Sequence, residues 1–249
     1  MKYNKSEKLY DKNSEKWKRD KFVCLSDFTA RDKIFKIAGN LKNMVIGDLG
    51  CGEGFCSRFF EKKGARKIYG FDISQKMINL AKSKNTKKIV FKKSSITNIK
   101  LKKNTLDHTF VIFVFNYLKK KEIIRACKEI YRVTKNGGKI YISVPHPFYP
   151  FLAKKNEIFF FKTLKSSDYI NKVDKELKGY ISRIDKTKLP VKMYHHTLED
   201  YFNAFRLSKL KKILDFKELK VTKKHLKKNF NFFGKVKNLP LHILFILEK

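Results

Sequence analysis

The sequence is poor in the residues that would point to a disulfide scaffold, a zinc site or a membrane segment. Its 249 residues include four cysteines, five prolines and one tryptophan. The cysteines form no Cys-x-x-Cys pair and no cluster with histidine at zinc spacing, so we expect buried, reduced thiols and no metal. No secretory signal and no apolar run long enough to cross a bilayer is visible, which predicts a cytoplasmic protein without a membrane partner.

Acidic side chains are also few, because 23 aspartates and glutamates face 59 lysines and arginines and the formal net charge is +36. Clustered cations favour a nucleic-acid partner, since they release counterions from a phosphate backbone. Here lysine supplies nearly all of the excess and is spread through every segment, whereas arginine, the bidentate reader of phosphate and guanine, is scarce. The pattern favours solvated lysines produced by compositional bias. A polyanion-binding surface is the alternative.

The most informative stretch is an apolar strand at 45–49 that runs into a loop with glycine at alternate positions. Gly50, Gly52 and Gly54 permit backbone angles closed to other residues and let a ligand lie against the main chain. Unpaired N–H groups at the start of the following helix favour a carboxylate or phosphate. The G-x-G-x-G spacing matches neither the dinucleotide fingerprint nor a phosphate-binding loop that ends in Gly-Lys-Ser/Thr. An ordinary strand-to-helix turn is the simpler alternative.

A second strand at 67–71 ends in Asp72, where a carboxylate can bind both hydroxyls of a ribose. The glycine loop and this acid together indicate a nucleoside ligand. Asp48 to Gly54 also follows the D/E-x-G-x-G-x-G signature of class I S-adenosylmethionine-dependent methyltransferases. The chain resembles this family in its type 11/25, small-molecule subgroup. The resemblance implies S-adenosyl-L-methionine as the cofactor and methyl transfer as the reaction.

The resemblance also implies which side chains surround the cofactor. Ser95 stands where the family often has an acid, so adenine recognition is expected to depend on backbone groups and on the apolar Ile73 and Ile96. Tyr10, in a Tyr-Asp pair, either packs on the methionyl part or belongs to a helix held by Trp17. The residues expected at the cofactor are Asp48, Gly50, Cys51, Gly52, Gly54, Asp72, Ile73, Ser95, Ile96 and Tyr10.

Three residues that follow central strands are candidates for the reaction centre. Asn116 and Tyr117 come after the apolar strand at 106–114, at the edge where parallel sheets bind ligands. Their segment is not the Asn/Asp-Pro-Pro-Tyr/Phe tetrad of enzymes that methylate exocyclic amines. His146, between two prolines after the strand at 140–144, is either a proton acceptor in the cavity or a histidine that bonds the loop backbone.

The order of strands and helices predicts one α/β domain over 1–249 with a doubly wound, mainly parallel seven-stranded sheet and an antiparallel last strand. We expect an N-terminal helical arm at 1–43, a cofactor-binding core at 44–148, a substrate lid inserted at 149–194, and a C-terminal helix with edge strands at 195–249. Further expectations are a helix capped by Asp27 or Thr29, a hairpin around 185–188, a turn at Gly137-Gly138 and a sixth strand at 216–221.

After the lid, the segment from His195 resembles the His-Arg-Thr-Leu segment of small-molecule methyltransferases, with His196 at the arginine position. Thr197 and Asp200 predict a capping box at the start of a helix. Each histidine either faces the substrate or serves core packing or capping. The expected reaction is in-line attack by an oxygen, nitrogen or activated carbon of a small molecule. Alignment and water exclusion can drive it without a dedicated base. Two rivals are an RNA methyltransferase and a non-catalytic binding protein.

Overall fold

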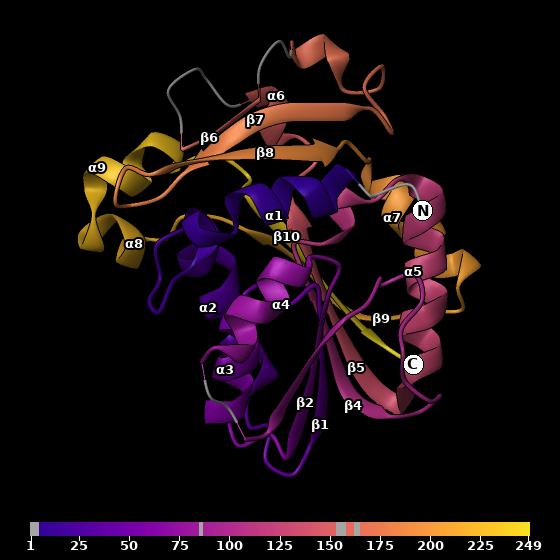
Figure 1. The fold of residues 1–249 in the computed structure, drawn as a ribbon. Coiled ribbons are helices and arrows are strands. Elements are labelled where there is room, and N and C mark those ends of the chain that lie inside the picture. The colour runs from indigo at the N-terminus through magenta and orange to yellow at the C-terminus, as the bar shows by residue number, and fades with distance from the viewer. Residues whose placement is uncertain (1–4, 85–86, 153–157, 162–164) are drawn as a thin grey trace.

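The structure, a computed structural model, describes residues 5–84, 87–152, 158–161 and 165–249, and a seven-stranded sheet forms its centre (Figure 1). The strands lie in the order β3-β2-β1-β4-β5-β10-β9. β10 (His242–Glu248) runs antiparallel to both of its neighbours, β5 and β9 (Lys212–Leu219). The other pairs are parallel and join β1 (Val45–Leu49), β2 (Lys67–Asp72), β3 (Ile89–Lys93), β4 (Leu106–Ile112) and β5 (Thr134–Pro145). The predicted fold class is confirmed.

Helices cover both faces of this sheet, so its strands are buried on both sides and are almost wholly apolar. Side chains of successive residues in one strand point to opposite faces of the sheet and so pack in different hydrophobic cores. On β5, Ile140 and Ile142 pack in the core under α5 and α7, whereas Tyr141 packs in the core under α2 and α3. The covering helices are α5 (Lys120–Val133) and α7 (Leu198–Leu207) on one face, and α2 (Asp32–Ala38), α3 (Phe55–Lys62) and α4 (Gln75–Lys82) on the other.

A second, antiparallel sheet of three strands, the lid sheet, lies beyond the carboxyl ends of the parallel strands (Figure 1). It consists of β6 (Phe159–Phe161), β7 (Glu176–Ser182) and β8 (Lys188–Tyr194). The hairpin predicted around 185–188 is confirmed, since β7 and β8 pair from Glu176 with Tyr194 to Ser182 with Lys188. Helix α1 (Lys5–Trp17) lies between the lid sheet and α4.

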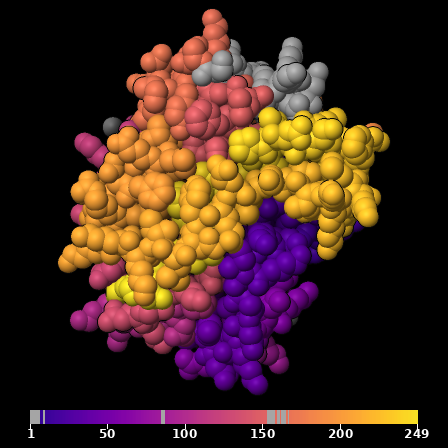
Figure 2. Space-filling view, turned by 180° about the vertical axis from the view of Figure 1, so that it is seen from behind, coloured from indigo at the N-terminus to yellow at the C-terminus, as the bar shows by residue number. Residues whose placement is uncertain are grey.

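Short helices complete the chain. Seen from behind, the segment from α7 to the C-terminus covers one side of the molecule and adjoins the N-terminal helices (Figure 2). None of the described helices is long and apolar enough to cross a membrane. The short elements are a π-helix (Asp27–Arg31), α6 (Tyr149–Leu152), α8 (Lys223–Lys228), α9 (Phe230–Phe233) and 3-10 turns at Phe115–Tyr117, Ser166–Asp168 and Gly234–Val236.

Two strand boundaries differ from the prediction. Gly137 and Gly138 lie within β5 instead of forming a turn before it, because their backbone pairs with the last residue of the chain: Gly137 N–H donates to Lys249 O and Lys249 N–H to Gly138 O. Strand β9 begins at Lys212, before the predicted start at 216, because β10 extends far enough to pair Lys212 with Glu248. Both differences come from pairing with a distant segment.

The predicted cap before α2 is also different. Asp27 accepts hydrogen bonds from the N–H groups of Val23 and Cys24, at 3.0 and 2.8 Å, and Thr29 donates its hydroxyl to Leu25 O. Neither side chain caps α2, which continues directly from the π-helix. The capping box at α7 is confirmed, since the Asp200 N–H donates to Thr197 Oγ1 and the Thr197 N–H to Asp200 Oδ2.

Candidate functional site

A cavity of about 210 Å³ lies at the carboxyl edge of the parallel strands. The loops after β1, β2, β3 and β4 form its floor, and α1 and the lid sheet form its other walls. Of the residues predicted at the site, all but Gly54 and His146 line this cavity. The structure thus brings together eleven of the predicted residues: Tyr10, Asp48, Gly50, Cys51, Gly52, Asp72, Ile73, Ser95, Ile96, Asn116 and Tyr117.

The glycine loop places main-chain atoms in the wall of the cavity. Gly50 and Gly52 have φ of +80° and +55°, which other residues adopt only with strain. A Cβ at Gly50 would meet Val114 Cγ2 at 2.2 Å, whereas one at Gly52 would point into open space. The N–H groups of Gly50 and Cys51 donate to Phe71 O at 2.7 and 2.9 Å, which fixes the loop on the end of β2. Gly54 serves the loop itself, as the left-handed residue before α3.

Asp72 ends β2 and is held by the main chain. Its Oδ2 accepts the Gly52 N–H and its Oδ1 the Ser74 N–H, both at 2.9 Å. Burial raises the pKa of this carboxyl, and the backbone hydrogen bonds oppose that rise. Each carboxylate oxygen accepts a second hydrogen bond at low cost, so the group is positioned to receive two neighbouring hydroxyls.

Asp48 lies beneath the glycine loop and is only 2% exposed. Ser57 donates its hydroxyl to Asp48 Oδ2 at 2.5 Å. Burial raises the pKa of Asp48 to about 6, although the Ser57 hydrogen bond and the positive charge of Arg31 oppose that rise. The side chain therefore joins the loop to α3 and presents negative charge to the cavity in neutral solution.

The wall beyond Asp72 is mostly apolar, as predicted for an adenine site. Ile73 and Ile96 line it together with Met77. The Ser95 hydroxyl lies 2.8 Å from Thr97 Oγ1 and accepts the Thr97 N–H at 3.2 Å, so it is engaged within its own turn. The structure thus leaves backbone groups and apolar contacts for a base at this end.

The arm helix α1 closes one side of the cavity. Tyr10 contacts the edge of Tyr117, with ring centroids 5.4 Å apart, and packs on Trp17 at 5.5 Å. Its neighbour Asp11 accepts the Ser74 hydroxyl at 2.5 Å and the Lys76 N–H at 3.4 Å, at the start of α4. The Tyr-Asp pair therefore has two roles, with the tyrosine toward the cavity and the aspartate holding the arm on the core. Both readings of Tyr10 fit, since it also touches Trp17.

Asn116 and Tyr117 follow β4 and lie between the arm and the floor. The Tyr117 hydroxyl is hydrogen-bonded by Tyr10 and Asn116, and these bonds oppose the rise that burial causes in its pKa. Asn116 is 4% exposed. Its Oδ1 has no hydrogen-bond partner among the described residues. Because a buried carbonyl without a partner is costly, this oxygen is suited to accept a donor from a ligand.

The predicted histidines do not face the cavity. His146 Nδ1 accepts the Phe148 N–H at 3.2 Å, and Nε2 lies 3.1 Å from Glu218 Oε1 on β9. The loop-bonding alternative describes this side chain, because both ring nitrogens are engaged away from the cavity. His195 and His196 are buried and donate from Nε2 to the carbonyls of Tyr169 and Leu118, at 2.9 and 2.8 Å. Their place is in the core between the lid sheet and α7.

Sequence reasoning missed two arginines and a histidine that line the cavity. Arg19 and Arg31 share the fully buried Asp27 carboxylate at 3.5 and 3.1 Å, and their own side chains are 7% and 12% exposed. His242, the first residue of β10, is 6% exposed. It reaches the site because β10 runs antiparallel, so its start lies beside Pro145 at the end of β5. The scarcity of arginine was the one available signal.

All four cysteines are buried and free, which confirms the predicted thiols. Cys24, Cys51 and Cys56 line the cavity. Burial raises the pKa of Cys24 to about 11 and that of Cys56 to about 12, and it raises the pKa of Cys51 as well. These thiols are therefore not nucleophiles near neutral pH. Within the described part of the chain, no group of His, Cys, Asp or Glu side chains is arranged to hold a metal ion.

Comparison with known proteins supports the resemblance to methyltransferases. Residues 47–142 match the family model of the methyltransferase domain. A malonyl-[acyl-carrier protein] O-methyltransferase of Hamiltonella defensa is 27% identical over 111 residues, which cover 45% of this chain and 42% of that protein. The match thus spans less than half the length of that relative.

Solved structures share the fold over nearly the whole chain. An S-adenosylmethionine-dependent methyltransferase from Mesorhizobium loti superposes with a TM-score of 0.69 at 18% identity, covering 90% of this chain and 99% of that one. A putative S-adenosylmethionine-dependent methyltransferase from Listeria monocytogenes gives 0.65 at 20% identity, over 88% and 96% of the two chains. These matches show that the chain has the α/β fold of S-adenosylmethionine-dependent methyltransferases. The match at 47–142 and this fold support a class I S-adenosylmethionine-dependent methyltransferase.

The residues present fit S-adenosylmethionine, the cofactor of this family. Open space in front of Gly52 admits a ligand against the main chain, and Asp72 offers two oxygens at the same place. Ile73 and Ile96 supply an apolar wall for a base. Asn116 Oδ1, which has no partner among the described residues, can accept a hydrogen bond from a ligand in the cavity.

Proposed function

We propose that this methyltransferase acts on a small molecule that it encloses in the cavity between α1, the lid sheet and the parallel strands. The observation that supports a small acceptor is this enclosure. Arm, lid and core each contribute side chains to one cavity, and the lid side chains are mainly apolar: Ile158, Phe161, Ile181, Val191 and Met193. Such a site can exclude water from a reacting pair.

In this proposal the chain's own residues act by binding, orientation and exclusion of water. Asp72 holds the ribose hydroxyls, and the glycine loop lets the cofactor lie against the backbone. Asn116 and Tyr117 position the methionyl part from the floor, and Tyr10 closes over it from the arm. Bound S-adenosylmethionine supplies an electrophilic methyl group on a sulfonium. Alignment of the acceptor then accounts for most of the rate enhancement.

The assignment of Asp72 and its neighbours to the cofactor, and of 149–194 to a substrate lid, is part of this proposal. The named activity of the Hamiltonella defensa relative, O-methylation of a malonyl group on a carrier protein, is consistent with an oxygen acceptor here. It covers too little of either chain to extend that substrate to this protein.

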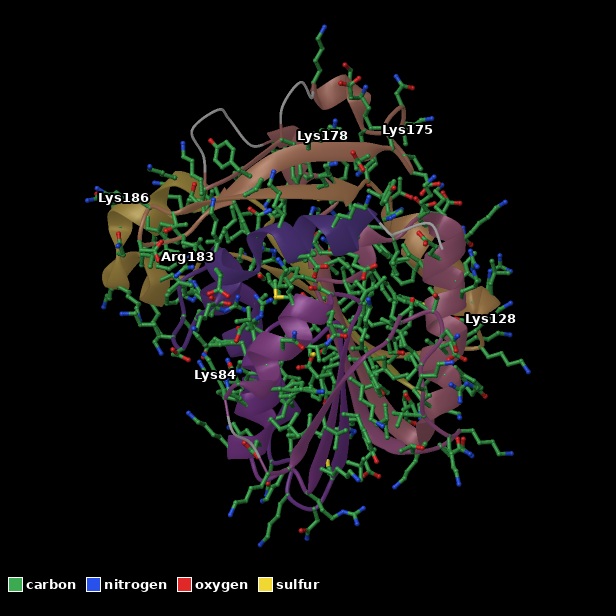
Figure 3. All side chains as sticks on the ribbon, viewed as in Figure 1. Lys84, Lys128, Lys175, Lys178, Arg183 and Lys186 are labelled. Carbon is green, nitrogen blue, oxygen red and sulfur yellow. The ribbon has the colours of Figure 1, made fainter. Side chains whose placement is uncertain are left out.

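The RNA alternative has less support from the distribution of charge. Figure 3 labels Lys84 after α4, Lys128 on α5, and Lys175, Lys178 and Lys186 along the lid sheet, so these cations lie on different sides of the molecule. Spread cations increase non-specific affinity for any polyanion, and salt suppresses that affinity. These lysines do not form a continuous basic surface that leads to the reaction centre.

The test is incubation with methyl-labelled S-adenosylmethionine and two acceptor pools, a metabolite extract and total RNA from the same cells. We expect label in a compound of low molecular mass, identified by mass spectrometry. Label in RNA at physiological salt would support the nucleic-acid rival. Calorimetry with S-adenosylmethionine alone distinguishes both methyltransferase hypotheses from a non-catalytic protein. A protein that cannot bind the cofactor would give no heat of binding.

A further inference from the structure

His242 is the most exceptional polar group of the cavity. It is 6% exposed, and neither ring nitrogen has a hydrogen-bond partner among the described residues. An imidazole always has at least one N–H to donate, and leaving it unpaired in the interior costs about 1–3 kcal/mol. His146, which directly follows Pro145, shows the contrast, because both of its nitrogens are engaged. The ring of His242 is therefore suited to bind a ligand that enters the cavity.

The surroundings of His242 carry positive charge. The Phe113 ring lies 5.0 Å from the His242 ring and 5.0 Å from the Arg31 guanidinium. Arg31 and Arg19 share the Asp27 carboxylate, while Asp48 lies in the field of Arg31 and Glu53 in that of Arg19. Nε of each arginine is buried and lacks a partner within the described residues. The bound cofactor adds one positive charge, since its ammonium and sulfonium outweigh its carboxylate. An anionic acceptor would match this environment.

The backbone conformation of Phe113 also indicates a ligand site in the part of the cavity beside His242 and Arg31. Phe113 has φ of +60°, a left-handed conformation that a bulky residue rarely adopts. Its N–H donates to Ser143 O at 2.8 Å, which holds the strained residue against β5. Strain of this kind costs about 1–3 kcal/mol and concentrates at ligand sites. Here it sets the aromatic ring between the arginine and the histidine.

The cavity is poor in groups that could remove a proton from an acceptor. Burial lowers the pKa of His242 to about 3 and raises the pKa of both Tyr10 and Tyr117. The carboxylates each accept a hydrogen bond from the protein: Asp48 from Ser57, Asp72 from Gly52 and Ser74, Glu53 through Oε2 from Arg58, and Glu122 from Lys119. Glu53 Oε1 has no partner among the described residues, but Oε2 of the same carboxylate is paired with the Arg58 cation. An acceptor that is already an anion needs no base.

We propose that the methyl acceptor is a carboxylic acid with an apolar body, whose carboxylate accepts a hydrogen bond from His242 in the positive field of Arg19 and Arg31. The apolar body lies along the lid sheet, against Phe161, Val191 and Met193. A carboxylate oxygen forms the new bond to the methyl carbon as the sulfur–methyl bond breaks, and that electron pair goes to sulfur. The products are a neutral methyl ester and S-adenosylhomocysteine, and no proton is transferred. This inference rests on the proposed function.

The test is calorimetry with protein saturated by S-adenosylhomocysteine. The two probes, octanoate and 1-octanol, have the same hydrocarbon chain and differ only in their head group. We expect octanoate to bind at least about tenfold more tightly, because a hydrogen bond to a charged group is worth roughly 1.5–3 kcal/mol. His242→Leu should abolish the preference, and His242→Gln, which keeps an N–H donor, should retain part of it. His108→Gln, at the opposite end of β4, is the matched control.

Equal affinity of wild type for the two probes would overturn the proposal, and so would an undiminished preference in His242→Leu. The affinity of each variant for S-adenosylhomocysteine, measured first, reports folding and the cofactor site separately. If the cofactor product fails to bind wild type, the proposed function fails, and the probes are not needed to show it. For turnover in a metabolite extract, an ester releases labelled methanol in mild alkali, whereas alkali-stable label would contradict the proposal.

Discussion

The two halves of the cavity are built differently. In the half that we assign to the ribose and adenine, Asp48, Asp72 and Ser95 each have hydrogen-bond partners in place, mostly from residues within a few tens of positions. In the other half, where we place the methionyl part and the acceptor, Asn116 Oδ1 and both nitrogens of His242 have none within the described chain. A half with its polar groups already paired is rigid before binding. The other half holds polar groups whose burial cost a ligand would remove.

The strongest test of this contrast is Asp72→Ala. Loss of two charge-assisted hydrogen bonds to ribose should lower the affinity for S-adenosylmethionine at least about tenfold. The affinity of Asp72→Asn should lie between those of wild type and Asp72→Ala, because the asparagine amide keeps one acceptor oxygen. Calorimetry is the measurement, with Asp185→Ala in the exposed lid turn as the control. Unchanged affinity in Asp72→Ala would refute the ribose assignment.

A pH series tests the buried histidines on the acceptor side. Burial lowers the pKa of His195 to about 4, whereas an unfolded histidine titrates near 6.5. The unfolded chain therefore binds more protons, and the free energy of unfolding falls as pH decreases from about 6.5 toward 4. The loss should be on the order of 1–3 kcal/mol for this group. His195→Gln should flatten the decline in thermal unfolding midpoint, and Lys186→Gln should not. An unaltered slope in His195→Gln would contradict a neutral buried ring.

The arm offers an intermediate effect. Asp11→Ala removes the hydrogen bonds from Ser74 and Lys76, so α1 should detach more often from α4. We expect cofactor affinity to fall about threefold, on the scale of one hydrogen bond of 0.5–1.5 kcal/mol. Amide exchange of residues 7–16 should speed up in the same variant. Glu15→Ala, exposed on the same helix, is the control, and equal exchange in the two variants would show that Asp11 does not hold the arm.

Ser95→Ala should have the smallest effect. The Ser95 hydroxyl is engaged by Thr97, so its removal leaves the apolar adenine wall of Ile73 and Ile96 in place. Cofactor affinity should change less than about twofold, which corresponds to about 0.4 kcal/mol. A tenfold loss, measured by the same calorimetry as for Asp72→Ala, would mean that this serine recognises the base after all.

The cofactor half could be predicted because its signals are local in sequence. The strand at 45–49, the alternating glycines and Asp72 form one continuous pattern, and so do the strands and helices that follow. The pairing of a strand with a segment far along the chain could not be predicted from such local patterns. Gly137 and Gly138 look like a turn until Lys249 pairs with them, and β9 is lengthened by β10.

The same limit explains the histidines. His146 follows a central strand, which pointed to the cavity, but Glu218, far along the chain, binds its ring instead. His242 sits within the apolar run of the last strand and gives no motif. Its place at the site follows from the antiparallel direction of β10, which brings the beginning of that strand to the edge where the parallel strands end. Arg19 and Arg31 similarly depend on how the arm folds back over the core.

The position of Trp17 has a practical consequence. It is the chain's one tryptophan, and it lines the cavity at the end of α1 while its ring packs on Tyr10. Excitation at long ultraviolet wavelengths therefore selects a single emitter at the junction of arm and cavity. Its emission gives an optical signal of ligand entry in the native sequence, with no label attached, and stopped-flow recording would time the arm's movement in each variant above.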